Sequence, residues 1–391
     1  MVRQEIRSLT GLRGLAAVFV MLYHFTRTEQ TVAGPALSGS QFLSHGYLSV
    51  DVFFVLSGFI MALTYCEMFA DEGGLGGRRT RAALPVFLGH RIARIYPLYI
   101  VMTLIMAAIH YAPFTHSQVV PNINLTLVSN IFLVQSWDMT RSLVSPAWSI
   151  STEFAAYLLF PLLLTVYVSG SRWLAWAGGL LAVAVCLWIA TTTQYGDPHS
   201  ARSGLLDFWR PTSLAPLLRC LVEFCFGLLT FRYYRTASAA RMKLLAAISP
   251  LVLAVMVGAC LWPDTDLIWL ALVPLLILGL AQDRGIVARA LAWTPMHWLG
   301  VLSYSIYLVH PMLTKATRVV GDALEARGVP YGHAIMVAVD GALVVVCAYA
   351  AYRLIERPGR RLLRGAFDRL EWTRKPALAT SVGEAGGLTR N

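Results

Sequence analysis

The chain has 391 residues, of which 57% are hydrophobic and 14% are charged, and its formal net charge is +11. Soluble globular domains carry about 25% charged residues, so this composition excludes that class and indicates an integral membrane protein. Helices of about 20 residues joined by short loops would fill this length as one bundle. The lipid bilayer is therefore the first expected partner, and no nucleic-acid partner is expected.

Ten apolar segments are predicted to cross the membrane. A shorter segment, 123–136, contains Asn124, Asn130 and Gln135 and spans only about 14 residues, which is typical of a re-entrant or interfacial helix. The expected fold is therefore all-α, a polytopic helical membrane bundle of about ten transmembrane helices plus one short re-entrant or interfacial helix. The ten predicted spans are 12–27, 47–66, 92–111, 146–168, 173–193, 212–231, 244–262, 267–281, 298–314 and 333–352.

Basic residues are distributed unequally between the two sides of this arrangement. With ten spans, 24 of the 32 lysines and arginines lie on the side of the N-terminus or at its membrane edge, whereas a crossing by 123–136 would divide them 15 against 17. Because cytoplasmic loops carry the excess of positive charge, we expect ten spans in the cell inner (cytoplasmic) membrane, with both termini cytoplasmic. Residues 1–365 are expected to form one transmembrane domain, and 366–391, rich in Ala, Gly and Thr, a disordered tail.

The first predicted span carries two basic side chains, Arg13 and His24, eleven residues apart. Eleven residues make about three helical turns, so both side chains project from one face, roughly 16 Å apart along the axis. Each costs on the order of 3 kcal/mol near the bilayer centre unless it faces protein or water. This pair therefore predicts a functional site, and Gly11 and Gly14 are expected to leave room for a ligand beside Arg13.

Other ionisable residues lie within or next to the predicted spans. Arg91 and Arg94 are one turn apart, and their guanidinium groups suit phosphate oxygens, with ordinary anchoring at the membrane surface as the alternative. Arg219 and Glu223 are neighbours on a helix face, a spacing typical of a pair that holds helices in register. Asp51 is a further buried carboxylate that could orient His24 or a water molecule.

Two predicted helices carry polar and aromatic side chains at helical spacing. After Pro146, one face near the outer mouth presents groups on which a sugar could stack and form hydrogen bonds, with Glu153 among them. In the ninth span such groups recur every three or four residues, where core packing is the alternative. Ser57 has no GxSxG elbow around it, so we interpret it as a small residue at a helix contact. The candidate substrate-binding residues are Trp148, Ser149, Tyr304, Tyr307 and His310.

Several motifs in order along the chain resemble the membrane-bound acyltransferase family 3. These polytopic enzymes move acyl groups, mostly acetyl, from coenzyme A onto hydroxyls of sugars, lipid-linked glycans or antibiotics. The resemblance covers residues 6 to about 358, with one departure, Thr10, where the family usually has Asp. The motifs are IRSLTGLRGLAA at 6–17, LYHF at 22–25, VDVFFVLSGFI at 50–60, RIARIYP at 91–97, Trp148-Ser149 with Glu153, Arg219 with Glu223, and LG through SYSIYLVH at 299–310.

The resemblance implies an acyl-CoA-dependent O-acyltransferase whose usual co-substrate is acetyl-CoA. His24 would be the general base for the acceptor hydroxyl. Arg13, Arg91 and Arg94 would contact the donor, and Arg13, Asp51 and Glu153 would assist catalysis. No metal is expected, because the six cysteines lie within or at the ends of apolar segments without metal-ligand spacing.

The expected acceptor is a sugar hydroxyl in a surface polysaccharide, lipid-linked glycan or related glycoconjugate. A macrolide or other small-molecule antibiotic is the alternative within the enzyme class, and a sugar or polyol transporter is the alternative from another class. The sequence specifies neither the acceptor and acyl chain length nor the oligomeric state, and it leaves direct transfer and a covalent acyl-enzyme both open.

Overall fold

A computed structural model of the chain describes residues 5–27, 40–69, 78–111, 122–192, 204–207, 213–329 and 332–374. These residues form helices and turns and contain no strand, as expected where lipid offers no partner for exposed backbone groups. The long helices are α1 (Arg7–Arg27), α4 (Ser49–Tyr65), α5 (Arg78–Tyr111), α7 (Trp148–Leu164), α8 (Arg172–Thr192), α9 (Ala215–Thr236), α10 (Ala239–Ala259), α11 (Asp266–Leu280), α13 (Thr294–Ala326) and α14 (Gly332–Ala351). Shorter helices are α3 (Gln41–Ser44), α6 (Ile123–Ile131) and α12 (Ile286–Leu291), and α15 (Arg357–Arg374) follows α14.

Each of the ten predicted spans falls on one of the long helices. Within the described residues, seven helical segments are long and apolar enough to cross a membrane. Of the other long helices, α9 carries buried charges and α11 has 15 residues. The all-helical, polytopic membrane fold is confirmed, and the number of crossings stays a prediction.

The short segment at 123–136 forms α6, a helix of nine residues followed by turns. Nine residues extend about 14 Å, less than half of a bilayer core of about 30 Å. The side chain of Asn130 is fully buried, and its amide donates to the carbonyls of Thr126 and Arg141. Tyr99 of α5 donates to the Asn130 carbonyl at 2.7 Å. The Asn130 side chain therefore holds the end of this short helix to the turn that follows it, and the Asn130 carbonyl connects the helix to α5.

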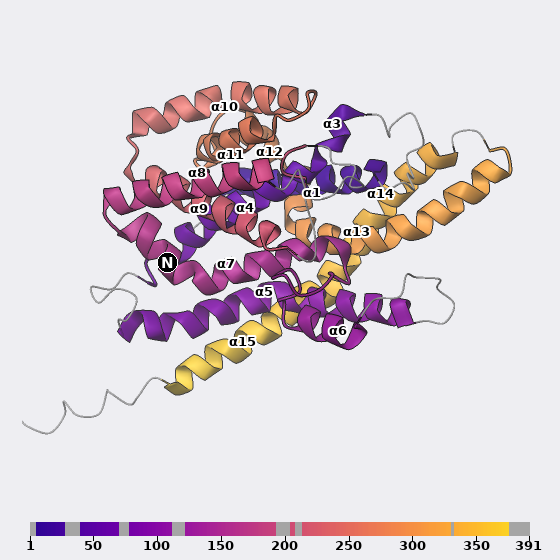
Figure 1. The fold of residues 1–391 in the computed structure, drawn as a ribbon, viewed down its shortest axis with the longest axis horizontal. Helices are drawn as coiled ribbons and strands as arrows, with labels where there is room; N and C mark the ends of the chain where they lie inside the picture. The colour runs from indigo at the N-terminus through magenta and orange to yellow at the C-terminus, as the bar shows by residue number, and fades with distance from the viewer. Residues whose placement is uncertain are drawn as a thin grey trace, which may run out of the picture.

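The long helices lie side by side along the long axis of the molecule, with α10 at one edge and α15 at the opposite edge (Figure 1). α15 packs along α5, where a side chain at Gly89 would lie 2.7 Å from the Phe367 ring. α15 extends to Arg374, past residue 366, at which the tail was predicted to begin. Residues 375–391 of that predicted tail lie outside the described residues.

α1 is held by close backbone contacts. A side chain at Gly11 would overlap the carbonyl oxygen of Leu291 in α12, and one at Gly14 would lie 2.5 Å from the amide nitrogen of Gly300 in α13. The expectation that these glycines leave room for a ligand is therefore wrong, because neighbouring helices fill that space. The first turn of α1 is capped by Asp283, whose carboxylate accepts from the amides of Arg7 and Ser8 at 3.0 and 2.8 Å.

α4 and α9 approach each other through Gly58 and Gly227. A side chain at Gly58 would overlap the Phe224 carbonyl oxygen, and one at Gly227 would overlap that of Val55. The small residue at this helix contact is thus Gly58, and the interpretation of Ser57 in that role is wrong, because Ser57 faces another way and lines a cavity.

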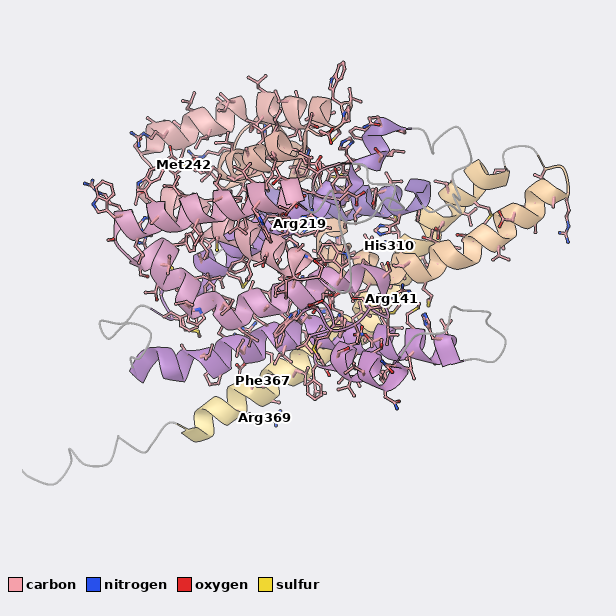
Figure 2. All side chains as sticks on the ribbon, viewed as in Figure 1. Arg141, Arg219, Met242, His310, Phe367 and Arg369 are labelled. Carbon is pink, nitrogen blue, oxygen red and sulfur yellow. The ribbon has the colours of Figure 1, made fainter. Side chains whose placement is uncertain are left out.

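A buried ion cluster lies beside this contact. The Arg219 guanidinium donates to Asp51 at 2.8 and 2.5 Å, to Glu223 at 3.1 Å and to the Leu206 carbonyl at 2.7 Å. Figure 2 shows Arg219 inside the bundle, where its side chain is 3% exposed. Burial without a partner would be costly for each of these charges, so the cluster fixes α4 against α9. Arg219 and Glu223 therefore form the register-holding pair that their spacing predicted.

Candidate active site

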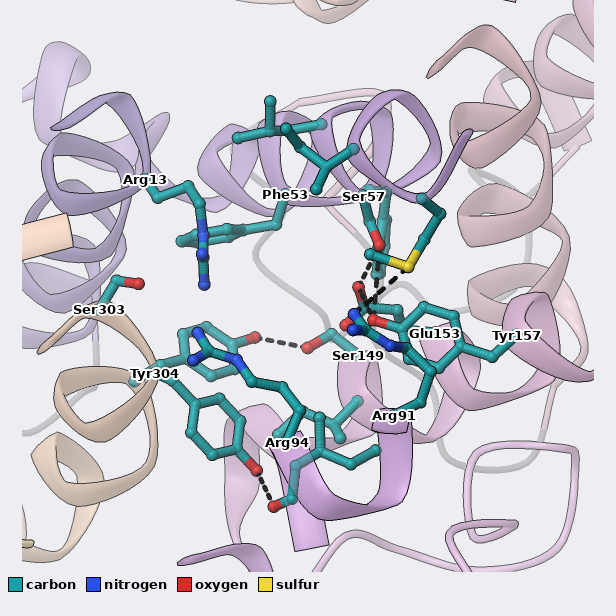
Figure 3. Close-up of a pocket in the computed structure, with 17 residues that line it drawn as sticks. Arg13, Phe53, Ser57, Arg91, Arg94, Ser149, Glu153, Tyr157, Ser303 and Tyr304 are labelled. Carbon is teal, nitrogen blue, oxygen red and sulfur yellow. Dashed lines mark hydrogen bonds between the residues drawn. The ribbon is translucent and has the colours of Figure 1, made fainter. Parts of the chain in front are cut away.

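Five helices enclose a cavity of about 170 Å³ in the middle of the bundle. α1 contributes Arg13, α4 contributes Phe53 and Ser57, and the remaining lining comes from α5, α7 and α13. Figure 3 shows these side chains converging from opposite walls. The cavity therefore joins segments from both halves of the chain. Its polar and ionisable lining residues are Arg13, Ser57, Arg91, Arg94, Ser149, Glu153, Tyr157, Ser303, Tyr304 and Tyr307.

Arg13 projects into the cavity from a helix that its glycines fix in place (Figure 3). Within the described part of the chain, its guanidinium makes neither a hydrogen bond nor an ion pair. A guanidinium group offers five N–H donors in a planar fork. Arg13 therefore presents a cation with unused donors to whatever enters the cavity.

Arg91 lines the same cavity but is held by uncharged groups. It donates to the Tyr65 hydroxyl at 2.7 Å and to the Met61 sulfur at 3.3 Å. Its guanidinium carbon lies 5.0 Å from the centre of the Tyr65 ring and 5.9 Å from that of Tyr157. These contacts fix the side chain through cation–π attraction and leave its charge without an ion pair among the described carboxylates.

Arg94 reaches the cavity one turn after Arg91. Its nearest ion-pair contact is long, 3.5 Å to the fully buried Glu356. Glu356 also accepts from Ser305 at 2.7 Å, and Tyr304 donates to the Ile95 carbonyl at 2.5 Å. α13 and the π-helical turn Tyr352–Glu356 between α14 and α15 thus hold α5 at the position from which Arg94 faces the cavity.

Glu153 is the carboxylate that lines this cavity. One of its oxygens accepts from Ser57 at 2.5 Å and from Tyr157 at 2.6 Å. Neither Ser57 nor Tyr157 was predicted for the site. Tyr157 follows Glu153 by four residues, which is the spacing of neighbours on one helix face and the signal that could have indicated it.

From Tyr307 in the cavity lining, aromatic ring contacts lead through His310 to His24. Tyr307 contacts Ser149 at 2.8 Å through its hydroxyl and donates to the Pro146 carbonyl at 3.0 Å. Its ring centre lies 6.1 Å from that of His310, which lies 5.0 Å from that of His24. His24 itself is absent from the cavity lining.

The two histidines share a backbone arrangement that fixes their tautomers. Nδ1 of His24 lies 2.8 Å from the Val20 carbonyl, and Nδ1 of His310 lies 3.1 Å from that of Ile306. A neutral imidazole that donates from Nδ1 keeps a lone pair on Nε2. Nε2 of His310 is buried without a hydrogen-bond partner. In both rings Nδ1 is thus the donor, and the lone pair lies on Nε2.

The structure divides the predicted site residues into groups. Arg13, Arg91, Arg94 and Glu153 line one cavity together with Ser149, Tyr304 and Tyr307. His24 and His310 contact each other next to it. Two residues lie elsewhere: the Trp148 ring packs 6.2 Å from Phe54, and Asp51 is bound to Arg219. Asp51 is therefore part of the ion cluster between α4 and α9 and absent from the cavity lining.

Among the residues that the structure describes, no group of three His, Cys, Asp or Glu side chains is placed to hold a metal ion. The cavity lining offers instead three guanidinium groups against one carboxylate. This surplus of positive charge suits an anionic ligand.

A family model described as "Acyltransferase domain" matches residues 6–353, which is most of the chain. The chain belongs to this acyltransferase family. Together with the apolar helices, this makes it a polytopic membrane protein of the acyltransferase class. The family identity that the motifs predicted is confirmed.

Curated relatives carry acyltransferase names. The acyltransferase MdmB of Streptomyces mycarofaciens is 29% identical over 382 residues, which cover 92% of each chain. The peptidoglycan O-acetyltransferase OatA of Listeria monocytogenes is 24% identical over 92% of this chain and 56% of its own. The putative peptidoglycan O-acetyltransferase YrhL of Bacillus subtilis is 24% identical over 91% of this chain and 55% of its own. This chain thus spans about half the length of the latter two, and no solved structure matches it.

Proposed function

We propose that the protein is a membrane O-acyltransferase that moves an acyl group, acetyl in the first instance, from acyl-CoA to a hydroxyl of a sugar in a glycan or glycoconjugate. The surplus of positive charge around the central cavity is the observation that carries this proposal. Coenzyme A bears several phosphate charges, and guanidinium forks match phosphate oxygens. A neutral sugar or polyol would give three converging arginines no counter-charge, which argues against a transporter for such a substrate.

The donor would bind from the cytoplasmic side of the inner membrane. Positive-inside counting predicts that the start of α1 and the arginine-bearing part of α5 face the cytoplasm. Arg13, Arg91 and Arg94 would hold the phosphates or the polar arm of the donor. The extended arm of coenzyme A separates its thioester from its phosphates, which suits a reaction centre further along α1.

His24 would act as the general base in this scheme. It lies about 16 Å beyond Arg13 along α1, and its Nδ1 contact with the Val20 carbonyl leaves Nε2 as the basic nitrogen. The acceptor hydroxyl would lose its proton to Nε2 and attack the thioester carbon. The C–S bond would then break, and coenzyme A would leave as the thiol after receiving that proton. Ser149, Tyr304 and Tyr307 would bind the acceptor or the thioester arm.

Formation of the ester product gives the first test. Membranes containing the full chain, supplied with labelled acetyl-CoA and a glycan acceptor, are expected to form labelled, base-labile ester. His24→Gln is expected to lower this rate by about 10²- to 10⁴-fold, the usual contribution of a positioned base. A suitable control is His297→Gln, because His297 pairs with Glu5 at 3.2 Å and lies outside the cavity lining. Full activity of His24→Gln would refute the assignment.

Mass spectrometry identifies the acceptor class. Surface glycans from cells with and without the protein are expected to differ in O-acetylation. Identical glycans, together with acyl transfer to a macrolide or another small molecule, would favour the small-molecule acceptor. Uptake of sugar by liposomes in the absence of acyl-CoA would instead support the transporter.

A further inference from the structure

A second hollow lies between α8, α9 and α11 and shares no lining residue with the central cavity. It is a groove of about 640 Å³, and its walls are almost entirely apolar. α8 lines it from Arg172 to Leu187, sixteen residues whose ends lie about 22 Å apart along the helix. That length exceeds half of a bilayer core of about 30 Å, so the groove suits one extended hydrocarbon chain.

One end of the groove is cationic. Arg172 and Arg232 both line it, and its lining includes no carboxylate. One nitrogen of Arg232 donates to the Gly170 carbonyl at 2.9 Å and to those of Tyr167 and Val168 at 3.3 Å, which positions the guanidinium without neutralising it. Arg172 lies over the Trp173 ring, with its guanidinium carbon 5.2 Å from the ring centre.

The same end has the character of a membrane interface. Trp173 and Trp176 are 71% and 68% exposed within the first two turns of α8, as is typical of aromatic residues at the level of lipid headgroups. The N-terminus of α8 opens here, and Ser171 caps it by accepting from the Leu174 amide at 3.2 Å. Its dipole adds partial positive charge to that of the two arginines.

We propose that this groove is a specific binding site for an anionic phospholipid. The phosphodiester would lie between Arg172 and Arg232, and one acyl chain would extend between α8, α9 and α11. Charge complementarity selects this occupant, because a partner helix or a zwitterionic lipid would leave the surplus of positive charge unmatched. The proposal is independent of the acyl-transfer reaction, since it rests on a separate set of residues.

Lipid binding to the full chain, purified in mild detergent, tests this site. Native mass spectrometry would compare retention of dioleoylphosphatidylglycerol and dioleoylphosphatidylcholine. We expect preferential retention of phosphatidylglycerol, and a loss of about tenfold in its affinity for Arg172→Gln, as for one charge-assisted hydrogen bond. Arg241→Gln is the matched control, because Arg241 is exposed and lies outside the groove lining.

Blocking the groove with a bulky side chain provides the second part of the lipid-binding test. Ala271 is an exposed lining residue of α11, so Ala271→Trp fills the groove without entering the core, and we expect it to abolish retention of both lipids. Ala184→Trp adds the same bulk to α8 outside the lining and is expected to leave retention unchanged. Equal retention of the two lipids with no effect of Arg172→Gln would show nonspecific boundary lipid and overturn the proposal. Dissociation of a dimer by Ala271→Trp, with bound lipid unchanged, would overturn it in favour of a second copy of the chain.

Discussion

Arg13 and Arg94 line the same cavity, yet replacing each by glutamine is expected to have different consequences. Arg13 has neither a hydrogen bond nor an ion pair to the described residues, so Arg13→Gln removes a half-buried cation without leaving a partner behind. Arg94 lies 3.5 Å from the fully buried Glu356, which would lose its cation in Arg94→Gln. The first variant is therefore expected to affect donor binding alone, and the second to affect both donor binding and folding.

The size of the Arg13 effect follows from the bonds that its guanidinium can form. One charge-assisted hydrogen bond to the donor contributes about 1.5–3 kcal/mol. At 1.36 kcal/mol per factor of ten, its loss raises the KM for acetyl-CoA by roughly 10- to 150-fold. The melting temperature in detergent is expected to stay the same or rise, because an unpaired buried charge opposes folding. In Arg94→Gln, the melting temperature is expected to fall together with donor affinity.

Steady-state transfer of labelled acetyl from acetyl-CoA, paired with thermal unfolding followed by size-exclusion chromatography, separates the two effects. Thermal protection by acetyl-CoA gives an independent measure of donor binding. An unchanged KM in Arg13→Gln would refute its contact with the donor. A fall in melting temperature as large as that of Arg94→Gln would show that Arg13 has a structural partner, contrary to the reasoning.

Three further substitutions test the packing that supports the site. Gly227→Ala is expected to destabilise the protein by about 1–3 kcal/mol, because the new methyl group overlaps the Val55 carbonyl oxygen. In Gly258→Ala of α10 the new methyl group meets nothing within 4 Å, so this variant is expected to be slightly more stable. Equal melting temperatures for the two variants would contradict this expectation. Arg219→Gln is expected to lose about 3–5 kcal/mol, since Asp51 and Glu223 remain buried without their cation, and near-wild-type thermal stability would count against the cluster.

The helical spans followed from the sequence because apolar length is a local property. The grouping of Arg13, Arg91 and Arg94 was also accessible, since costly charges in membrane helices must face protein or water. Glu153 was expected near the outer mouth, but it lines the same cavity as the three arginines. The sequence did not indicate that Gly58 rather than Ser57 is the small residue at the helix contact, or that Ser57 lines the cavity. Adjacent residues on a helix point about 100° apart, and which of them meets a neighbouring helix depends on packing that the sequence does not display.

Contacts between residues far apart along the chain could not be predicted from the sequence either. Asp51 was a candidate for orienting His24 or a water molecule, but it binds Arg219, 168 residues away. The contact of His24 with His310 likewise depends on how α1 lies against α13. Periodicity places a side chain on a face of its own helix, and it does not specify which helix that face meets.

The glycine contacts of α1 have a consequence for how a donor could be admitted. Gly14 packs on the backbone of Gly300, and a side chain at Gly300 would overlap the Thr10 carbonyl oxygen, so α1 and α13 interlock in both directions. Two helices in backbone contact move as one body. Widening of the cavity between α13 and α5 would then require the hydrogen bond from Tyr304 of α13 to the Ile95 carbonyl of α5 to break. α15 packs along α5 and would move together with α5.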